Sequence, residues 1–160
     1  MSYQQYPQQQ QGYQAGTGEP PLWAPYYGAP LPVAVRRFFK KYATFTGRAS
    51  RSEYWWWVLV AVVVGIIINI ITGAGGTTVT AEGTPVPGPG ATVGLVLAVV
   101  WGLATIVPSL ALTARRLHDV NLSGWLVLLA VVPFLGAIAL LVLTILPSKP
   151  EGQRFDVPTA

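Results

Sequence analysis

The sequence predicts an all-α membrane protein with three transmembrane helices, at about residues 54–71, 91–112 and 124–146. Each range is an apolar run of eighteen residues or more, which is the length that a helix needs to cross the hydrocarbon core of a bilayer. The chain is 52% hydrophobic and only 10% charged, whereas a soluble domain is roughly 25% charged. Lys and Arg stand beside these runs and never within them, as expected for segments surrounded by lipid.

Residues 1–32 are rich in Gln, Tyr, Pro and Gly, and Glu19 is their only charged residue. They show no helical or strand periodicity. Such a composition buries too little apolar surface to offset the entropy of ordering, so we expect a disordered tail. It would serve either as a solvated tether or as a segment that recruits partners or self-associates.

Residues 33–45 are expected to form a short amphipathic helix, because aromatic residues recur at three- and four-residue spacing. The aromatic face holds Phe38, Phe39, Tyr42 and Phe45, and the opposite side holds Arg36, Arg37, Lys40 and Lys41. A helix of this type lies in the membrane interface with its cations toward anionic headgroups. We place it on the cytoplasmic leaflet.

The first transmembrane helix begins with signals for a helix start. Ser50 or Ser52 can cap it, and Glu53 suits the positive end of its dipole. Interfacial aromatic anchors are predicted at Tyr54, Trp55, Trp56, Trp57 and, at the start of the third run, Trp125.

Residues 72–90 are expected to be a flexible connection, and Pro108 is expected to kink the second helix near its end. The third run contains Pro133 and Gly136. It therefore forms either a bent spanning helix or a re-entrant hairpin. The multi-pass membrane domain would cover residues 33–155, followed by a C-terminal end at 156–160.

The distribution of Lys and Arg predicts the orientation. Eight lie before the first run or between the second and third, whereas two lie in the C-terminal tail and none in the first loop. The positive-inside rule places the N-terminus in the cytoplasm and, for three spans, the C-terminus outside. A re-entrant third run would return the C-terminus to the cytoplasm.

Seven ionisable residues flank the first and second runs at the predicted cytoplasmic face. This polar ring comprises Arg48, Arg51, Glu53, Arg115, Arg116, His118 and Asp119. It is either a topology signal that clamps helix ends, or a site for a lipid headgroup or small anion. Catalysis by His118 with Asp119 is disfavoured, because adjacent residues on a helix point apart.

Several classes of function are disfavoured by the sequence. There is no cysteine, no metal-ligand spacing and no phosphate-binding glycine loop, so we expect no metal and no cofactor. No ionisable residue lies within an apolar run, which argues against a proton pump. The cations flank apolar runs, so anionic membrane lipids are the expected partners and nucleic acid is not.

Three motifs together carry a family resemblance. They are Phe-Thr-Gly-Arg-Ala-Ser-Arg-Ser-Glu-Tyr-Trp at 45–55, Arg-Arg-Leu-His-Asp at 115–119 and Ser-Gly-Trp at 123–125. This combination resembles the domain of unknown function 805 (DUF805) family of small bacterial inner-membrane proteins, over roughly residues 37–155. The resemblance implies a multi-helix domain in the bacterial inner membrane with these motifs on one face, and it supplies no reaction. The family's C-terminal pattern, Gly-x-Asn-x-Phe-Gly, is only approximated by residues 152–156.

These features favour a non-enzymatic scaffold or interaction protein whose basic cytoplasmic face binds anionic lipid or a protein partner. The alternative is an oligomeric channel or transporter, suggested by small residues that allow close helix approach, namely Gly65, Gly94, Gly102 and Gly136.

Overall fold

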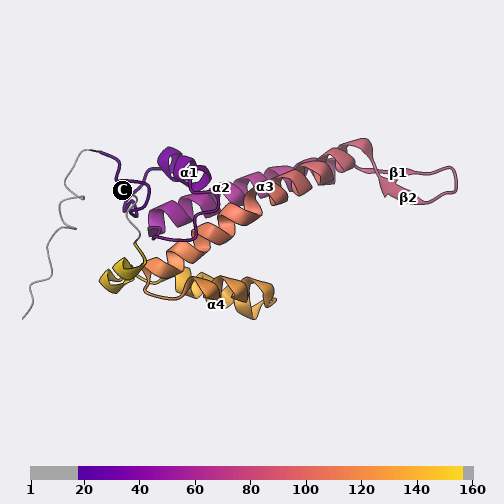
Figure 1. Ribbon diagram of the computed structural model, residues 1–160. Coiled ribbons are helices and arrows are strands. Elements are labelled where there is room, and N and C mark those ends of the chain that lie inside the picture. The colour runs from indigo at the N-terminus through magenta and orange to yellow at the C-terminus, as the bar shows by residue number, and fades with distance from the viewer. Residues whose placement is uncertain (1–17, 157–160) are drawn as a thin grey trace, which may run out of the picture.

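The computed structural model describes residues 18–156 and is built on two long antiparallel helices, α2 (Arg51–Ala74) and α3 (Pro89–Asp119) (Figure 1). At 1.5 Å per residue they are about 36 and 46 Å long. Both are long and apolar enough to cross a membrane, and they contain the first two predicted spans. Many of their apolar side chains are exposed; Leu103, for example, is 70% exposed.

The connection between α2 and α3 is a β-hairpin, where the sequence predicted only a flexible segment. Strand β1 (Thr77–Val79) pairs antiparallel with β2 (Pro85–Pro87). The turn is closed by backbone hydrogen bonds between Thr80 and both Gly83 and Thr84. The prolines at the two ends of β2 are compatible with a strand that has one unpaired edge.

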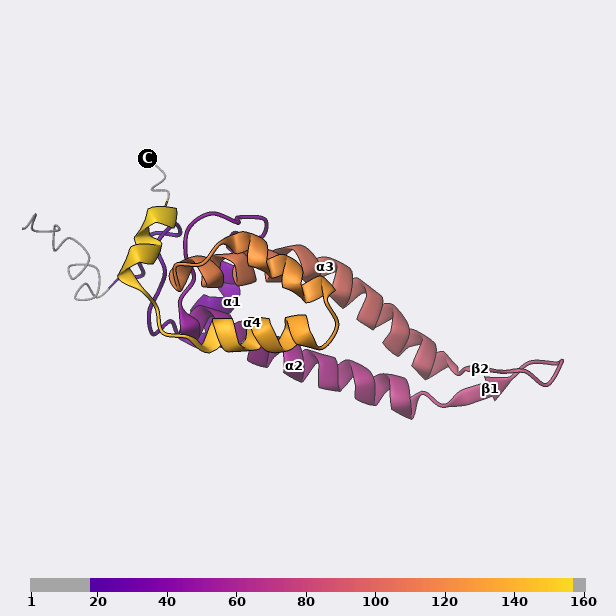
Figure 2. The same cartoon turned by 90° about the horizontal axis from the view of Figure 1, so that it is seen from below.

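The third apolar run is not one helix. It forms a 3₁₀ helix, η1 (Gly124–Val131), and a separate helix, α4 (Leu135–Ile145), which runs back beside it (Figure 2). Pro133 cannot donate a helical hydrogen bond and disfavours helical backbone at the residue before it, and Phe134 has a positive φ of 58°. The spanning helix predicted at 124–146 is therefore replaced by a hairpin, as in the re-entrant alternative.

Helix α1 (Leu31–Lys40) packs against the start of α2. The ring of Phe38 stacks on Trp57 with a centroid separation of 3.3 Å, and Trp57 in turn stacks on Trp101 at 5.9 Å. Trp57 is thus a core residue, only 3% exposed, rather than the interfacial anchor that was predicted. Of the other predicted anchors, Trp56 and Trp125 are exposed.

Pro108 leaves α3 as one continuous helix but frees a carbonyl within it. Proline has no N–H, so the oxygen of Ala104, four residues earlier, lacks its helical donor. The hydroxyl of Tyr42 donates to this oxygen at 3.0 Å. The bond holds the chain just after α1 against the apolar part of α3.

The segment just before α1 is packed against the start of α2, although it lies within the predicted tail. The carbonyl of Tyr26 accepts hydrogen bonds from the hydroxyls of Ser50 and Ser52 at 2.6 and 3.1 Å, and the backbone N–H of Ala29 donates to Ser52. Residues 1–17, on which most of the predicted tail falls, lie outside the described residues.

Candidate functional site

All ten Lys and Arg residues lie at one end of the α2–α3 pair, where α2 begins and α3 ends; we call it the basic end. The C-terminal helix η2 (Pro150–Phe155) is also there, because the N–H of Lys149 donates to the Asp119 carbonyl and that of Gly47 donates to the Phe155 carbonyl. The C-terminal segment thus lies beside the arginines, whereas three spans were expected to place it on the other side of the membrane. The cause is the break at Pro133, which turns the chain back.

Glu53 organises the first of two buried charge clusters. Ser50 and Glu53 form a capping box at the start of α2, in which the Ser50 N–H donates to the Glu53 carboxylate at 3.0 Å. The Tyr26 N–H and Arg37 Nε donate to the same carboxylate at 3.1 and 2.6 Å. Arg37 also donates to the carbonyls of Pro20, Pro21, Leu22 and Ala24. Arg37 was predicted to face headgroups, but it is 1% exposed and tethers the N-terminal segment.

Asp119 organises the second cluster and is fully buried. Its carboxylate accepts hydrogen bonds from the Tyr27 hydroxyl at 2.7 Å, from Ser148 and from Arg116. Arg48 lies 3.7 Å away. Burial, and then the negative charge of Asp119, raise the pKa of Tyr27 above its ordinary value. Tyr27 therefore stays a hydrogen-bond donor at neutral pH.

The arginines of this cluster join segments that are distant in sequence. Arg48 donates from Nε and Nη2 to the two oxygens of Asp156 at 2.9 and 2.7 Å. Burial is the largest single effect on Arg48 and lowers its pKa, but the bonds to Asp156 together with the charges of Tyr27, Asp156 and Asp119 outweigh it, so the pKa is raised and the charge is retained. Arg116 donates to the carbonyls of Thr144 and Leu146. It thereby satisfies the carbonyl end of α4, which has no partner within its own helix.

His118 is half-buried and does not contact Asp119 as an acid–base pair would. Its Nδ1 lies 2.9 Å from the Gly47 carbonyl, and its ring stacks on Phe155 at 4.1 Å. Gly152 makes this packing possible, because a Cβ there would lie 2.4 Å from the His118 carbonyl oxygen. His118 therefore packs against Phe155, and Asp119 belongs to the buried cluster described above. Within residues 18–156, no group of three His, Asp or Glu side chains is placed to hold a metal ion.

The predicted polar ring is therefore divided. Arg48, Arg116 and Asp119 share one cluster, Glu53 belongs to the other, and Arg51 is exposed outside both. Arg115 is buried beside the Glu53 cluster. The sequence analysis missed the roles of Tyr27, Ser148 and Asp156. Asp156 had a weak signal, because residues 152–156 approximate the family's C-terminal pattern.

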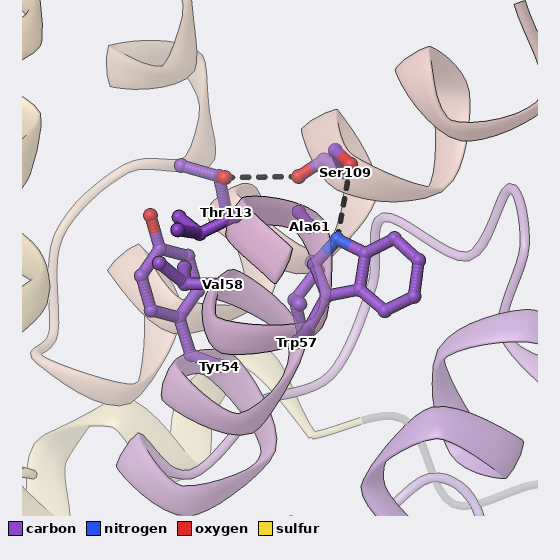
Figure 3. A pocket seen from close by; sticks show the side chains of 8 residues that line it. Tyr54, Trp57, Val58, Ala61, Ser109 and Thr113 are labelled. Atoms are coloured by element: carbon purple, nitrogen blue, oxygen red, sulfur yellow. Dashed lines mark hydrogen bonds between the residues drawn. The ribbon is translucent and has the colours of Figure 1, made fainter. Parts of the chain in front are cut away.

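An apolar pocket of about 330 Å³ lies between α2 and α3 near the basic end (Figure 3). Trp57 Nε1 donates to the Ser109 hydroxyl and so joins α2 to α3, and the Thr113 hydroxyl donates to the Ser109 carbonyl within α3. The mainly apolar lining suits an apolar group. Its lining residues are Tyr54, Trp57, Val58, Ala61, Val62, Ser109, Leu112 and Thr113.

Comparison with known proteins gives a family and named relatives. The family described as "Protein of unknown function (DUF805)" matches residues 42–157. The inner membrane protein YhaI of Escherichia coli is 42% identical over 103 residues, which cover 64% of this chain and 75% of YhaI. The inner membrane protein YhaH of the same organism is 29% identical over 120 residues, covering 74% of this chain and 89% of YhaH. No solved structure matches the chain.

Proposed function

The chain belongs to the DUF805 family, and on that premise we propose that it is a non-enzymatic interaction protein of the bacterial inner membrane. In this proposal its basic end lies in the cytoplasm and binds anionic phospholipid headgroups. One observation supports this proposal above the others. The ten Lys and Arg residues gather at one end of two apolar helices, and Glu82 is the only charged residue at the other. By the positive-inside rule the basic end is cytoplasmic.

The buried clusters leave few cations for headgroups. Among residues 18–156, Lys40, Arg51 and Lys149 are exposed and form no ion pair. Arg36 is bound to Glu19. Arg154 also forms no ion pair with the described residues, but its guanidinium lies over the ring of Phe155 at 4.6 Å and donates to the Asn121 carbonyl. Lys40, Arg51 and Lys149 are the proposed headgroup contacts, each contributing about 1 kcal/mol near an anionic surface.

The test is lipid selectivity in nanodiscs that contain equal amounts of phosphatidylglycerol and phosphatidylethanolamine. Native mass spectrometry would count the lipids of each kind that remain bound. We expect wild type to be enriched in phosphatidylglycerol and K40Q/R51Q to lose most of this enrichment. The matched control R36Q/R154Q removes the same number of charges from occupied cations and should lose less.

Equal losses in the two double variants would show that net charge acts without a defined surface. The proposal fails if wild type shows no preference for phosphatidylglycerol. It also predicts that raising the salt concentration weakens the preference, because exposed charges are screened.

A second candidate function, an oligomeric channel or transporter, is favoured by the hairpin of η1 and α4. Non-helical backbone at membrane depth is tolerated where protein or a water-filled cavity covers it, and the tip residue Phe134 is 84% exposed. Two of the small residues already serve packing within the chain, since a Cβ at Gly94 or Gly136 would clash with Thr72 or Leu129. Gly65 and Gly102 have open space and could serve contact between subunits.

This alternative predicts a defined oligomer in mild detergent and a solute flux across liposomes. Light scattering coupled to size-exclusion chromatography measures the first, and dye or ion release measures the second. A monodisperse monomer without flux would eliminate it.

A further inference from the structure

Arg115 carries a buried charged group that the fold does not satisfy. Its side chain is 1% exposed, and its Nε donates to the Ala111 carbonyl at 3.2 Å. Its Nη2 is buried and has no hydrogen-bond partner. A buried donor without a partner is costly, and more so when it is charged. Such a group is therefore a candidate for contact with a ligand.

The surroundings of Arg115 contain an excess of positive charge. Arg37, Lys41 and Arg115 are each at least 96% buried and gather around Glu53, itself 2% exposed. The half-buried Glu19 also pairs with Arg37, but it is shared with Arg36, so positive charge remains in excess. Glu53 already accepts bonds from Arg37 and from two backbone N–H groups. Lys41 forms no ion pair among the described residues. One bound anion would reduce this excess and would give the Arg115 Nη2 an acceptor.

The position of Lys41 favours a lipid as the source of that anion. Lys41 directly follows α1, and the next residue, Tyr42, reaches Ala104 in the apolar part of α3. The aromatic side chains of Phe39, Tyr42 and Phe45 nearby are 46%, 40% and 43% exposed. A phosphate group at Lys41 and Arg115 would thus lie beside an aromatic surface suited to acyl chains.

We propose that Lys41 and Arg115 bind the phosphate group of one tightly held phospholipid, at a site between α1 and α3 that is distinct from the exposed cations. This inference deepens the proposed lipid-binding function and rests on it. Burial, followed by the charges of Arg37 and Arg115, lowers the pKa of Lys41 to about 7 despite the opposing effect of Glu53. The negative charge of a bound phosphate would raise the pKa of Lys41 again.

The experiment uses the full chain, purified in detergent until bulk lipid is removed. Phosphorus analysis and native mass spectrometry measure the retained phospholipid, and thermal unfolding is followed with added phosphatidylglycerol or with inorganic phosphate. Wild type should retain about one phospholipid and unfold at a higher temperature with phosphatidylglycerol. K41M and R115M should each weaken this retention about tenfold or more, the range for hydrogen bonds to charged groups. R36Q, an exposed cation on α1 that is paired with Glu19, should retain the lipid.

Thermal unfolding separates a binding role from a structural one. R115M removes an unsatisfied buried charge, so it should unfold at the same temperature as lipid-free wild type or higher, yet gain nothing from phosphatidylglycerol. Equal stabilisation of wild type by inorganic phosphate alone would identify a free phosphate as the ligand and overturn the lipid assignment. No retained phosphorus and no stabilisation of wild type by either probe would overturn the site.

The two lipid proposals fail in different ways. Loss of the nanodisc preference in K40Q/R51Q with one phospholipid still retained supports both. A retained lipid in wild type without a general phosphatidylglycerol preference removes the proposed headgroup surface and leaves the site. A general preference with unchanged retention in K41M and R115M removes the site alone.

Discussion

At the residue scale, the buried ammonium of Lys41 makes stability depend on pH. The groups that act on it are Arg37 on α1, Glu53 on α2, Arg115 on α3 and Asp156 in the C-terminal segment. Its pKa is about 7 in the folded chain and 10.5 in the unfolded chain. Between these values the unfolded chain holds more protons, so the free energy of unfolding should rise from pH 7 to about 10, by at most about 1.4 kcal/mol per pH unit. Thermal unfolding of delipidated protein at each pH measures this rise. Subtracting the pH profile of K41M isolates the contribution of Lys41. Identical pH profiles of wild type and K41M would refute the burial of this charge.

Asp119 supports a second prediction at this scale. D119N keeps the size of the side chain but leaves Arg116 and Arg48 without their shared carboxylate. Removing one partner of a buried ion pair costs about 3–5 kcal/mol, so D119N should unfold far more easily in detergent. The carboxylate of Asp156 is more exposed and is paired with Arg48, so D156N should lose less; equal losses would contradict the central role of Asp119.

The same scale shows what the sequence could and could not predict. Ser50 and Glu53 were expected to start a helix, and the capping box confirms this because the signal is local. Arg36, Arg37, Lys40 and Lys41 looked alike, whereas the fold exposes the first and third and buries the other two. The partners of Arg37 lie at Glu53 and at the carbonyls of Pro20 and Ala24. Local periodicity contains no information on such distant contacts.

At the element scale, the chain just after α1 is held to α3 by the hydrogen bond from Tyr42 to the Ala104 carbonyl, which Pro108 leaves without its helical donor. Y42F removes the hydroxyl that binds the Ala104 carbonyl and should lower stability by about 1 kcal/mol. In a P108A background, the new N–H can bond to that carbonyl within the helix, so Y42F should cost less. Thermal unfolding of the four proteins forms a double-mutant cycle, and an unchanged cost in the P108A background would show that the two residues act independently.

Elements were predictable wherever one long apolar run forms one helix, as in α2 and α3. The third run is equally apolar, and its length alone favoured a span. Its hairpin depends on Pro133 together with a clamp that composition cannot reveal, in which Arg116 binds the carbonyls at the end of α4. The alternative was visible in the sequence, but the choice between the two required those contacts.

At the scale of the whole molecule, the hairpin changes the charge distribution on which the orientation rests. A spanning third helix would divide the ten cations eight to two, whereas the folded chain places all ten at the basic end. The positive-inside rule then favours one orientation more strongly, with the β-hairpin outside and the C-terminal segment in the cytoplasm.

Because the chain has no cysteine, single cysteines report this orientation without background. E82C lies in the turn of the β-hairpin and E151C in η2, and both positions are exposed. In spheroplasts treated with a membrane-impermeant maleimide, E82C should be labelled at once and E151C only after the membrane is permeabilised. The cysteine-free wild type is the control for nonspecific labelling. Labelling of both variants from outside would mean that the third run spans the membrane after all. Labelling of E151C alone would mean that the whole protein is inverted. The basic end would then lie outside, and the proposed cytoplasmic lipid surface would be refuted.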